Sequence, residues 1–256
     1  MKKFCLGNTD KRKYYAFPLI ALILFNSCDA NKKLNEALNR PHDFTELDLS
    51  YGQLTELNPD IEKFEKLTRL TLFKNKLTFL PPEIGHLPLL KELILSSNFL
   101  DSIPSEIGNL SKLKKLSLKN NRLKTLPLSI GQLYELETLD LEHNRLQSLP
   151  DEIGNLNNLT FLSLKNNLLT NINPAIGKLV NLEILILGRN QLTELPEEML
   201  HLKNLIQLDL TYSGLLRVPD FIAQLTNLEY LYIDPHMIVP QGVTSFNFNL
   251  KIIIKE

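Results

Sequence analysis

The stretch from Leu113 to Glu135 reads LKKLSLKNNRLKTLPLSIGQLYE, and leucine or isoleucine recurs in it at uneven intervals of two to five residues. An amphipathic helix would repeat its apolar residues about every 3.6 residues, and a half-buried strand would repeat them at every second residue. Neither period holds over the whole stretch. The spacing therefore predicts a coil that changes direction several times, with one short strand at Leu116 and Leu118.

The same pattern returns along the chain with a period of 23 residues. The asparagines that share one register are Asn75, Asn98, Asn121, Asn144, Asn167 and Asn190. The leucines that share another register are Leu47, Leu70, Leu93, Leu116, Leu139, Leu162, Leu185, Leu208 and Leu231. A fixed period of this length is typical of a solenoid, in which each coil packs on its neighbours.

The repeated pattern L-x-x-L-x-L-x-x-N-x-L-x-x-L-P-x-x-I-G-x-L resembles the leucine-rich repeat, in the 23-residue form of Ras-suppressor-like proteins and bacterial surface proteins. The resemblance covers residues 44–238, as eight full repeats and a truncated ninth. Gly52 replaces the asparagine in the first repeat, and Ser213 and His236 replace it in the last two. The resemblance implies an α/β fold: a right-handed leucine-rich-repeat solenoid with a parallel concave sheet and short helices or irregular arcs on the convex side.

Each repeated residue has a structural role in such a coil. Leu116 and Leu118 alternate with polar residues, so both point to the inner face of the strand. The asparagine amide has donor and acceptor groups, which suit it to bond the backbone where the chain leaves the strand. Prolines such as Pro127 begin the return arc, where no strand partner is needed, and glycines such as Gly131 permit a tight backbone there. We therefore assign these residues to the scaffold.

A solenoid needs caps, because a terminal repeat exposes its flank. Residues 28–43 are expected to form an anchor linker and an N-terminal cap, with a short amphipathic helix from its expected N-cap Asn31 to Pro41. Residues 239–256 are expected to form a C-terminal cap strand, because apolar residues alternate in them. The alternating residues are Phe246, Phe248, Leu250, Ile252 and Ile254.

Residues 1–27 have the pattern of a secretory signal peptide of the lipoprotein type. Basic side chains concentrate in residues 1–13, and the apolar run Tyr14–Phe25 is shorter than the roughly 20 residues of a membrane span. The sequence LFNSC, which ends at Cys28, resembles the lipobox of bacterial lipoproteins. This resemblance implies cleavage before Cys28 and attachment of a lipid to its thiol.

The expected location is therefore outside the cytoplasm, as a bacterial membrane-anchored lipoprotein on the outer membrane, the cell surface or the periplasmic side. Two alternatives stay open at this point. One is soluble secretion with cleavage after Ala30, and the other is an uncleaved membrane anchor. A lipid on Cys28 would account for a cysteine at this boundary, with none after it.

The residues that flank the inward leucines point away from the core, and arrays of this kind bind partners on the concave face. In the first half, Glu46, Arg69, Glu92 and Lys115 alternate in sign. Exposed ion pairs between neighbouring strands would contribute only about 0 to 1 kcal/mol each, so we assign this ladder to solubility and strand register.

The second half of the same face is expected to carry large apolar side chains. These are Phe161, Ile184, Ile186, Tyr212, Tyr230 and Tyr232. Aromatic residues on an exposed concave sheet are typical anchors for a protein partner, so we predict that this patch is the partner-binding site. The alternative is that the C-terminal strand or its loop folds over the patch.

The composition and the motifs disfavour several functions. The formal net charge is -1 at pH 7, and a mildly acidic body does not favour nucleic-acid binding. Cys5 and Cys28 are the only cysteines, which excludes a disulfide framework or a four-thiolate zinc site in the body. No GxSxG, HExxH or Walker A motif occurs, and there is no room for the catalytic domain of the leucine-rich-repeat ubiquitin ligases. We therefore expect no enzymatic activity, cofactor or small-molecule substrate.

Asp140, Glu142 and His143 cluster on one strand and its turn, where a weak divalent-cation site is conceivable. Lys119 and Lys165 flank Glu142, however, and would oppose a bound cation. The sequence therefore favours no metal site.

Together these observations predict a non-enzymatic protein-protein interaction module, anchored to a membrane through lipidated Cys28. The partner would be a host or envelope protein bound on the concave face. A self-associating structural envelope protein and a glycan-binding surface protein are the alternatives, since an apolar patch can also pair with itself and tyrosines can stack on sugar rings.

Overall fold

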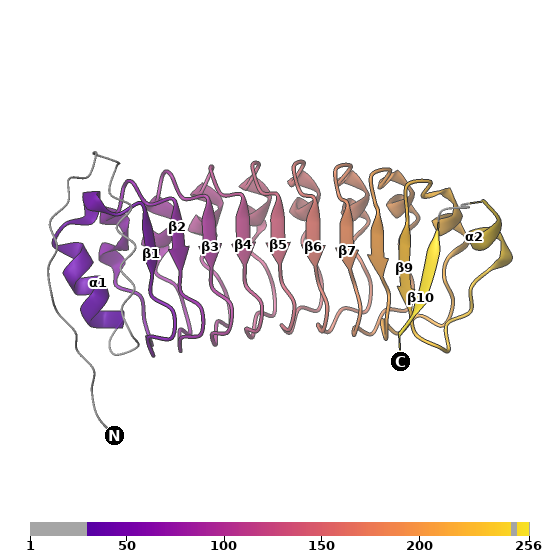
Figure 1. The fold of residues 1–256 in the computed structure, drawn as a ribbon, viewed down its shortest axis with the longest axis horizontal. Helices are drawn as coiled ribbons and strands as arrows, with labels where there is room; N and C mark the ends of the chain where they lie inside the picture. The colour runs from indigo at the N-terminus through magenta and orange to yellow at the C-terminus, as the bar shows by residue number, and fades with distance from the viewer. Residues whose placement is uncertain (1–29, 247–249, 256) are drawn as a thin grey trace, which may run out of the picture.

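The computed structural model describes residues 30–246 and 250–255, which form a gently curved array of coils (Figure 1). Ten parallel strands lie side by side in one sheet, in the order in which they occur in the sequence. The strands are β1 Glu46–Asp48, β2 Arg69–Thr71, β3 Glu92–Ile94, β4 Lys115–Ser117, β5 Thr138–Asp140, β6 Phe161–Ser163, β7 Ile184–Ile186, β8 Gln207–Asp209, β9 Tyr230–Ile233 and β10 Lys251–Ile254. This architecture confirms the predicted leucine-rich-repeat solenoid.

The opposite side of each coil is a short 3-10 helix, and an α-helix lies at each end of the array. The 3-10 helices are η1 Pro41–Asp43, η2 Pro59–Lys63, η3 Pro82–His86, η4 Ser105–Asn109, η5 Leu128–Gln132, η6 Asp151–Asn155, η7 Pro174–Lys178, η8 Glu197–His201 and η9 Asp220–Gln224. The α-helices are α1 Ala30–Leu38 and α2 Gln241–Phe246.

Equal repeat length sets the register of the sheet. Leu93 of β3 lies beside Leu70 of β2 and Leu116 of β4, and each pair is separated by one repeat. These leucines are fully buried and form one ridge under the sheet. Burying a leucine side chain stabilises a fold by about 1.5 to 3 kcal/mol, whereas a slip of one residue would turn the whole ridge toward solvent.

Asn121 shows how the predicted asparagine turn is bonded. Its Nδ2 donates to the carbonyl oxygen of Leu95 at 3.0 Å and to that of Leu118 at 2.9 Å. Its Oδ1 accepts from the backbone N–H of Leu100 at 3.0 Å. The buried amide therefore joins two successive repeats and satisfies backbone groups that would otherwise be orphaned. The same bonds are made by Asn75, Asn98, Asn144, Asn167 and Asn190.

The residue before each of these asparagines adopts a left-handed backbone conformation, a feature that the sequence pattern does not reveal. Asn120 has φ 55°, His143 has φ 56° and Arg189 has φ 55°. This conformation costs an ordinary residue about 1 to 2 kcal/mol. Backbone hydrogen bonds between neighbouring repeats hold this conformation in place, since the backbone N–H of Asn120 donates to Glu142 O at 2.8 Å.

The convex arcs stack closely because of the glycines predicted there. A Cβ atom on Gly131 of η5 would lie 2.5 Å from the carbonyl oxygen of Glu152 in η6, which leaves no room for a side chain. Leu200 of η8 and Ala223 of η9 occupy the same repeat position, and these two helices pack less closely than their predecessors. The 3-10 helices on the convex side are therefore more widely spaced at the C-terminal end.

The N-terminal cap is the helix α1, whose Leu34 is buried against the first repeat. Ala30 packs where a side chain at position 52 would project, because a Cβ on Gly52 would collide with the Ala30 methyl group. This contact explains why glycine replaces asparagine in the first repeat. The expected N-cap residue Asn31 lies inside the helix instead, since the helix begins at Ala30.

The C-terminal cap differs from the expected single strand. Gln241–Phe246 forms α2, so Phe246 is helical, and Phe248 lies outside the described residues. The helix packs on η9 and its Val243 is fully buried, because the open end of the core has to be covered. Only Lys251–Ile254 forms a strand, and it continues the sheet in parallel beside β9.

Candidate partner-binding face

The first half of the concave face carries the predicted ladder of charges. Arg69 Nε and Nη2 donate to Glu92 Oε2 at 2.8 and 2.6 Å, and Arg69 Nη1 lies 4.0 Å from Glu46 Oε2. The hydrogen bonds that Arg69 donates to Glu92 and the negative charge of Glu92 raise the pKa of the Arg69 guanidinium. Glu46, Arg69 and Glu92 thus satisfy one another. Lys115, the fourth residue of the predicted ladder, has no ion pair among the described residues.

A polar junction lies at the C-terminal ends of β4 and β5 and in the turns that follow them, between the two halves of the face. Glu142 Oε2 accepts from Lys119 Nζ at 2.7 Å, and its other oxygen lies 3.3 Å from His143 Nε2. Glu142 N–H donates to Asp140 Oδ1 at 3.1 Å, but burial outweighs this bond and raises the pKa of the Asp140 carboxyl. Within residues 30–246 and 250–255, no group of three or more histidine, cysteine or acidic residues is placed to hold a metal ion.

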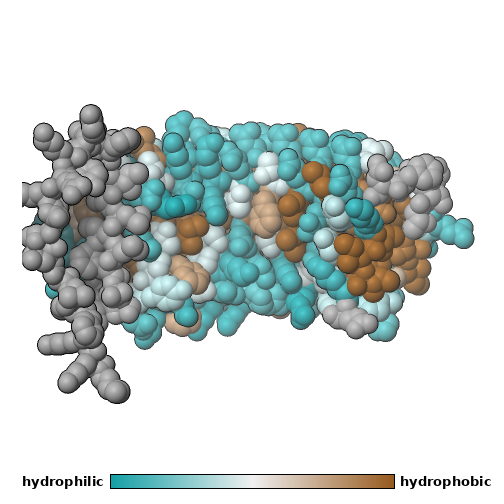
Figure 2. Space-filling view, in the orientation of Figure 1, coloured by the Kyte–Doolittle hydropathy of each residue, from teal (hydrophilic) through white to brown (hydrophobic). Residues whose placement is uncertain are grey.

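The apolar patch begins on β6 and β7. Phe161 and Ile184 are neighbours across the strand pair, and Ile186 lies beside Ser163. The three apolar side chains are half-buried, although they alternate with leucines that already fill the core. Ser163 Oγ is buried among them and has no hydrogen-bond partner in the described part of the chain. Apolar colouring in Figure 2 gathers over the C-terminal half of the molecule.

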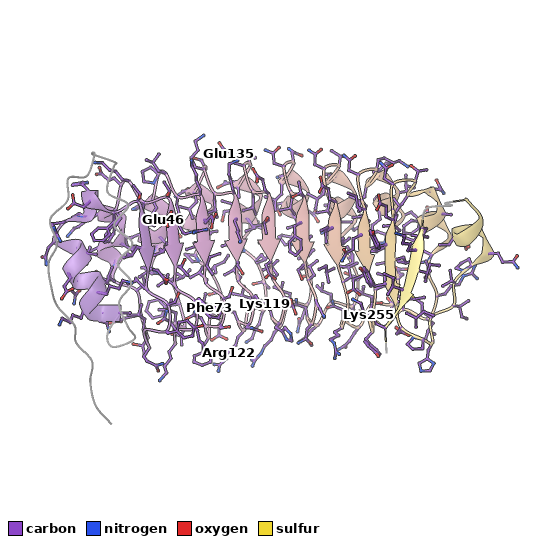
Figure 3. All side chains as sticks on the ribbon, in the orientation of Figure 1. Glu46, Phe73, Lys119, Arg122, Glu135 and Lys255 are labelled. Carbon is purple, nitrogen blue, oxygen red and sulfur yellow. The ribbon has the colours of Figure 1, made fainter. Side chains whose placement is uncertain are left out.

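The tyrosines of β9 lie under two lysines that the sequence pattern did not single out. Lys251 Nζ lies 5.2 Å from the ring centroid of Tyr230, and Lys255 Nζ lies 4.0 Å from that of Tyr232. Lys255 also approaches Asp209 Oδ2 at 3.4 Å. The only sequence signal for this arrangement is the alternation in the last strand, which places both lysines on the outward face. Lys255 is labelled at this end of the sheet in Figure 3.

Because β10 extends the sheet beside β9, this strand does not cross the face and leaves Phe161, Ile184 and Ile186 uncovered by itself. Tyr212 is the exception among the predicted site residues. It lies in the turn after β8 rather than on a strand, with its ring under the guanidinium of Arg189 at 5.4 Å. The structure therefore places Phe161, Ile184 and Ile186 side by side. Gln207 and Asp209 of β8 separate them from Tyr230 and Tyr232, and Tyr212 lies at the rim.

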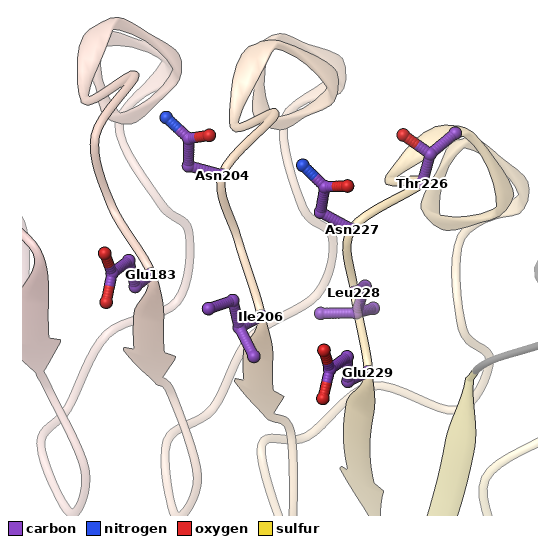
Figure 4. Close-up of a pocket in the computed structure, with 7 residues that line it drawn as sticks. All are labelled: Glu183, Asn204, Ile206, Thr226, Asn227, Leu228 and Glu229. Atoms are coloured by element: carbon purple, nitrogen blue, oxygen red, sulfur yellow. The ribbon is translucent and has the colours of Figure 1, made fainter.

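A cavity of about 290 Å³ adjoins the patch at the N-terminal ends of β7, β8 and β9 (Figure 4). Glu183 and Glu229 stand on either side of Ile206 in it, each one residue before Ile184 and Tyr230 respectively. Neither carboxylate has an ion-pair partner among the described residues. The repeat pattern carries no signal of this cavity, because it arises only when three repeats are stacked.

The predicted lipidation residue Cys28 lies outside the described residues. In the part of the chain that the structure describes, no helix combines the length and the apolar character that crossing a membrane requires.

Comparisons with known proteins agree with this architecture. A family model described as a leucine-rich repeat region matches residues 101–185 and 170–248, and a second one for the leucine-rich repeat matches residues 89–110. Both are repeat models, and neither describes a catalytic domain. No curated protein sequence matches the chain.

Solved structures show the same likeness. A leucine-rich repeat protein of Leptospira interrogans is 30% identical with a TM-score of 0.65, over 87% of this chain and 75% of its own. The plant peptide hormone receptor RGFR1, solved in complex with RGF2, is 32% identical with a TM-score of 0.72, over 83% of this chain and 36% of its own. A TDR receptor is 28% identical with a TM-score of 0.72, over 84% of this chain and 39% of its own. The chain thus spans little more than a third of these two receptor chains.

Proposed function

This chain belongs to the leucine-rich repeat family, and we propose that it is a non-enzymatic module that binds a protein partner on the C-terminal half of its concave face. One observation carries the proposal: Phe161, Ile184 and Ile186 stand on the outer face of the sheet, whereas the leucines beside them already fill the core. Apolar side chains in that position contribute little to packing the coil. Their burial against a partner would contribute about 25 cal/mol per Å² of apolar area, against which the entropy cost of association counts.

The surroundings of the patch indicate what kind of surface would fit it. The carboxylates of Glu183 and Glu229 line the adjoining cavity, and the lysines over Tyr230 and Tyr232 border the other side. A partner segment with an apolar centre and a basic group at its edge complements this arrangement. Among the similar structures, the receptor RGFR1 was solved with RGF2, and a peptide or an exposed protein loop is the corresponding ligand class for this chain.

We also propose that the module is exported and held on a bacterial membrane by a lipid on Cys28. The basic start, the short apolar run and the LFNSC sequence support this proposal. Mass spectrometry of the mature N-terminus tests it, because a diacylglyceryl group on Cys28 is expected there. A protein that begins after Ala30 without lipid would show soluble secretion, and an unprocessed N-terminus would show an uncleaved anchor. Protease treatment of intact cells would then report whether the repeats face the outside.

The binding proposal is tested by comparing two double variants on the same face. Phe161→Ala with Ile184→Ala removes the patch, and Arg69→Ala with Glu92→Ala is the matched control. A partner captured by the unmodified protein and identified by mass spectrometry supplies the ligand for a titration. We expect the patch variant to bind roughly 100-fold more weakly and the control to bind almost unchanged, since buried anchor residues contribute most of the affinity. Equal affinities for the three proteins, with intact circular dichroism spectra, would contradict the proposal.

Self-association is the second candidate, and the open edge of the sheet favours it. Among the described residues, the last strand, β10, pairs on one side only, and its Ile254 is 61% exposed. Light scattering after size exclusion distinguishes the two functions. A dimer would support self-association, whereas a monomer that retains partner binding supports the recognition module.

A further inference from the structure

The turns that follow the strands form a continuous flank along one edge of the solenoid, which we call the turn flank. It consists of the outward residues between the end of each strand and the proline of the same repeat. A second ladder of backbone bonds holds these turns in line: Phe99 N–H donates to Leu77 O at 2.8 Å, and Arg122 N–H donates to Leu100 O at 2.9 Å. Figure 3 shows Arg122 on this edge and Glu135 on the opposite edge.

The turn flank carries cations that no carboxylate neutralises. The cations without an ion pair within the described residues are Lys74, Lys76, Arg122, Lys124, Arg145, Lys165 and Arg189. On the opposite edge, Lys112 and Lys114 each lie 2.6 Å from a carboxylate oxygen, of Glu135 and Glu137 respectively. Lys66, Lys91 and Lys203 on that edge have no ion pair within the described residues, but Glu65, Glu183 and Glu229 balance their charge. The difference is notable in a chain whose formal net charge is -1. Carboxylates on the turn flank are fewer, among them those of Asp101 and Glu194.

Several of these cations are held against aromatic rings. Arg122 lies 4.5 Å from the centroid of Phe99, and Lys74 lies 5.2 Å from that of Tyr51. Such contacts contribute about 0.5 to 1 kcal/mol at exposed sites and restrict the motion of the charged group. The aromatic rings are themselves exposed, 52% for Tyr51 and 40% for Phe99. The flank therefore presents charge and apolar surface together in fixed positions.

Exposed aliphatic side chains continue this surface toward the C-terminal end. Leu216 is 81% exposed and Ile238 is 63% exposed, and the two residues are joined by a backbone hydrogen bond of 2.9 Å from Ile238 N–H to Leu216 O. The other large apolar side chains exposed on the turn flank are Phe79, Leu168 and Tyr212. Exposed leucine and isoleucine would not strengthen binding to a hydrated polyanion. They would strengthen binding to a lipid layer, because they can be buried at its apolar boundary.

We propose that the turn flank lies on an anionic lipid surface, with its lysines and arginines at the headgroups and its apolar side chains at the acyl boundary. Basic groups near such a surface each favour binding, and exposed aromatic and aliphatic residues add to the attraction. In this orientation the sheet stands upright on the membrane, so the concave patch stays open to a partner. The proposal depends neither on lipidation of Cys28 nor on the identity of that partner.

The absence of tryptophan from the sequence permits a direct test with the full chain. Phe99→Trp places an indole on the turn flank, and Tyr134→Trp places one on the opposite edge, where Tyr134 is 59% exposed. Vesicles of brominated phosphatidylcholine with phosphatidylglycerol quench an indole that reaches the lipid. Because both variants carry the same N-terminal residues, any attachment that those residues cause is common to the two proteins.

We expect quenching in the Phe99→Trp variant and little in the Tyr134→Trp variant. Adding Arg122→Gln, Arg145→Gln and Arg189→Gln to Phe99→Trp should lower the contact equilibrium by about 100-fold, at roughly fivefold per charge. The matched control adds Lys112→Gln and Lys114→Gln and should leave the quenching unchanged. Equal quenching in both tryptophan variants, or none in either, would overturn the proposal. An emission change in the Phe99→Trp variant with dextran sulfate but not with vesicles would also overturn it, because the flank would then bind a soluble polyanion.

Discussion

The two halves of the concave face share one backbone and one buried core, but they present different chemistry to solvent. On β2 and β3, Arg69 and Glu92 are bonded to each other, whereas on β6 and β7, Phe161 and Ile184 lie side by side with no polar partner. The leucines beneath both pairs are fully buried. The fold therefore does not determine which residue types occupy the outward strand positions. These positions can vary to suit a binding partner.

The buried scaffold itself also differs between the two ends, and this gives the largest predicted effect. Asn121→Ala removes two donated bonds and one accepted bond, which we expect to lower the free energy of unfolding by about 3 kcal/mol. Ser213 stands at the same repeat position, but its Oγ has no partner within the described residues. Ser213→Ala should therefore change stability little. Urea denaturation followed by circular dichroism measures both, and equal losses would show that the asparagine bonds do not set the difference.

A smaller effect should separate the charged and apolar halves of the face. A double-mutant cycle on Arg69 and Glu92 should give a coupling energy of about 0.5 kcal/mol that disappears in 1 M salt, since exposed ion pairs are weak and screened. The same cycle on Phe161 and Ile184 should give a coupling of about 0.5 kcal/mol that salt leaves unchanged. Thermal unfolding at low and high salt provides the measurement. A salt-sensitive coupling in the second pair would contradict the comparison.

The smallest effect is expected at the junction of the two halves. Burial raises the pKa of Asp140 above its value in the unfolded chain, so the folded state holds the proton more tightly. The wild type should then lose stability as the pH rises through the range between the two pKa values. Asp140→Asn removes this loss, so the variant should be more stable at pH 7, and the difference should shrink below the pKa of the unfolded chain. Melting temperatures from pH 3 to pH 8 test this, and a difference that does not change with pH would refute the assignment.

Much of the fold could be predicted, because each scaffold residue appears many times in the same register. The inward leucines, Asn121 and Gly131 have the expected roles. A residue type that recurs at one position in many repeats is required by the structure there, so its role can be inferred. The left-handed residue before the asparagine could not be predicted, because Asn120 and Arg189 are chemically unlike and share only a backbone angle. The C-terminal cap was only partly predicted. It occurs once, so nothing in the sequence distinguished the helix Gln241–Phe246 from a longer strand.

The candidate site was predicted at the level of residues but not of surroundings. Phe161 and Ile184 follow from strand alternation alone. The lysine above Tyr230 depends on the pairing of β10 with β9, which interrupts the 23-residue period, and the cavity beside Ile206 depends on side chains from three coils. A periodic sequence pattern therefore does not predict the contacts between side chains that differ from one repeat to the next.

The constant period of 23 residues has a further consequence for how such a molecule can change. Leu93 pairs in the sheet with its counterparts one coil away, Leu70 and Leu116. A whole coil can therefore be gained or lost while the remaining coils keep the same register. The insertion of a single residue within a strand differs, because it would turn polar side chains toward the leucine ridge in that coil. The length of the solenoid can thus change in steps of one 23-residue repeat. The concave surface becomes longer or shorter, while the two caps stay the same.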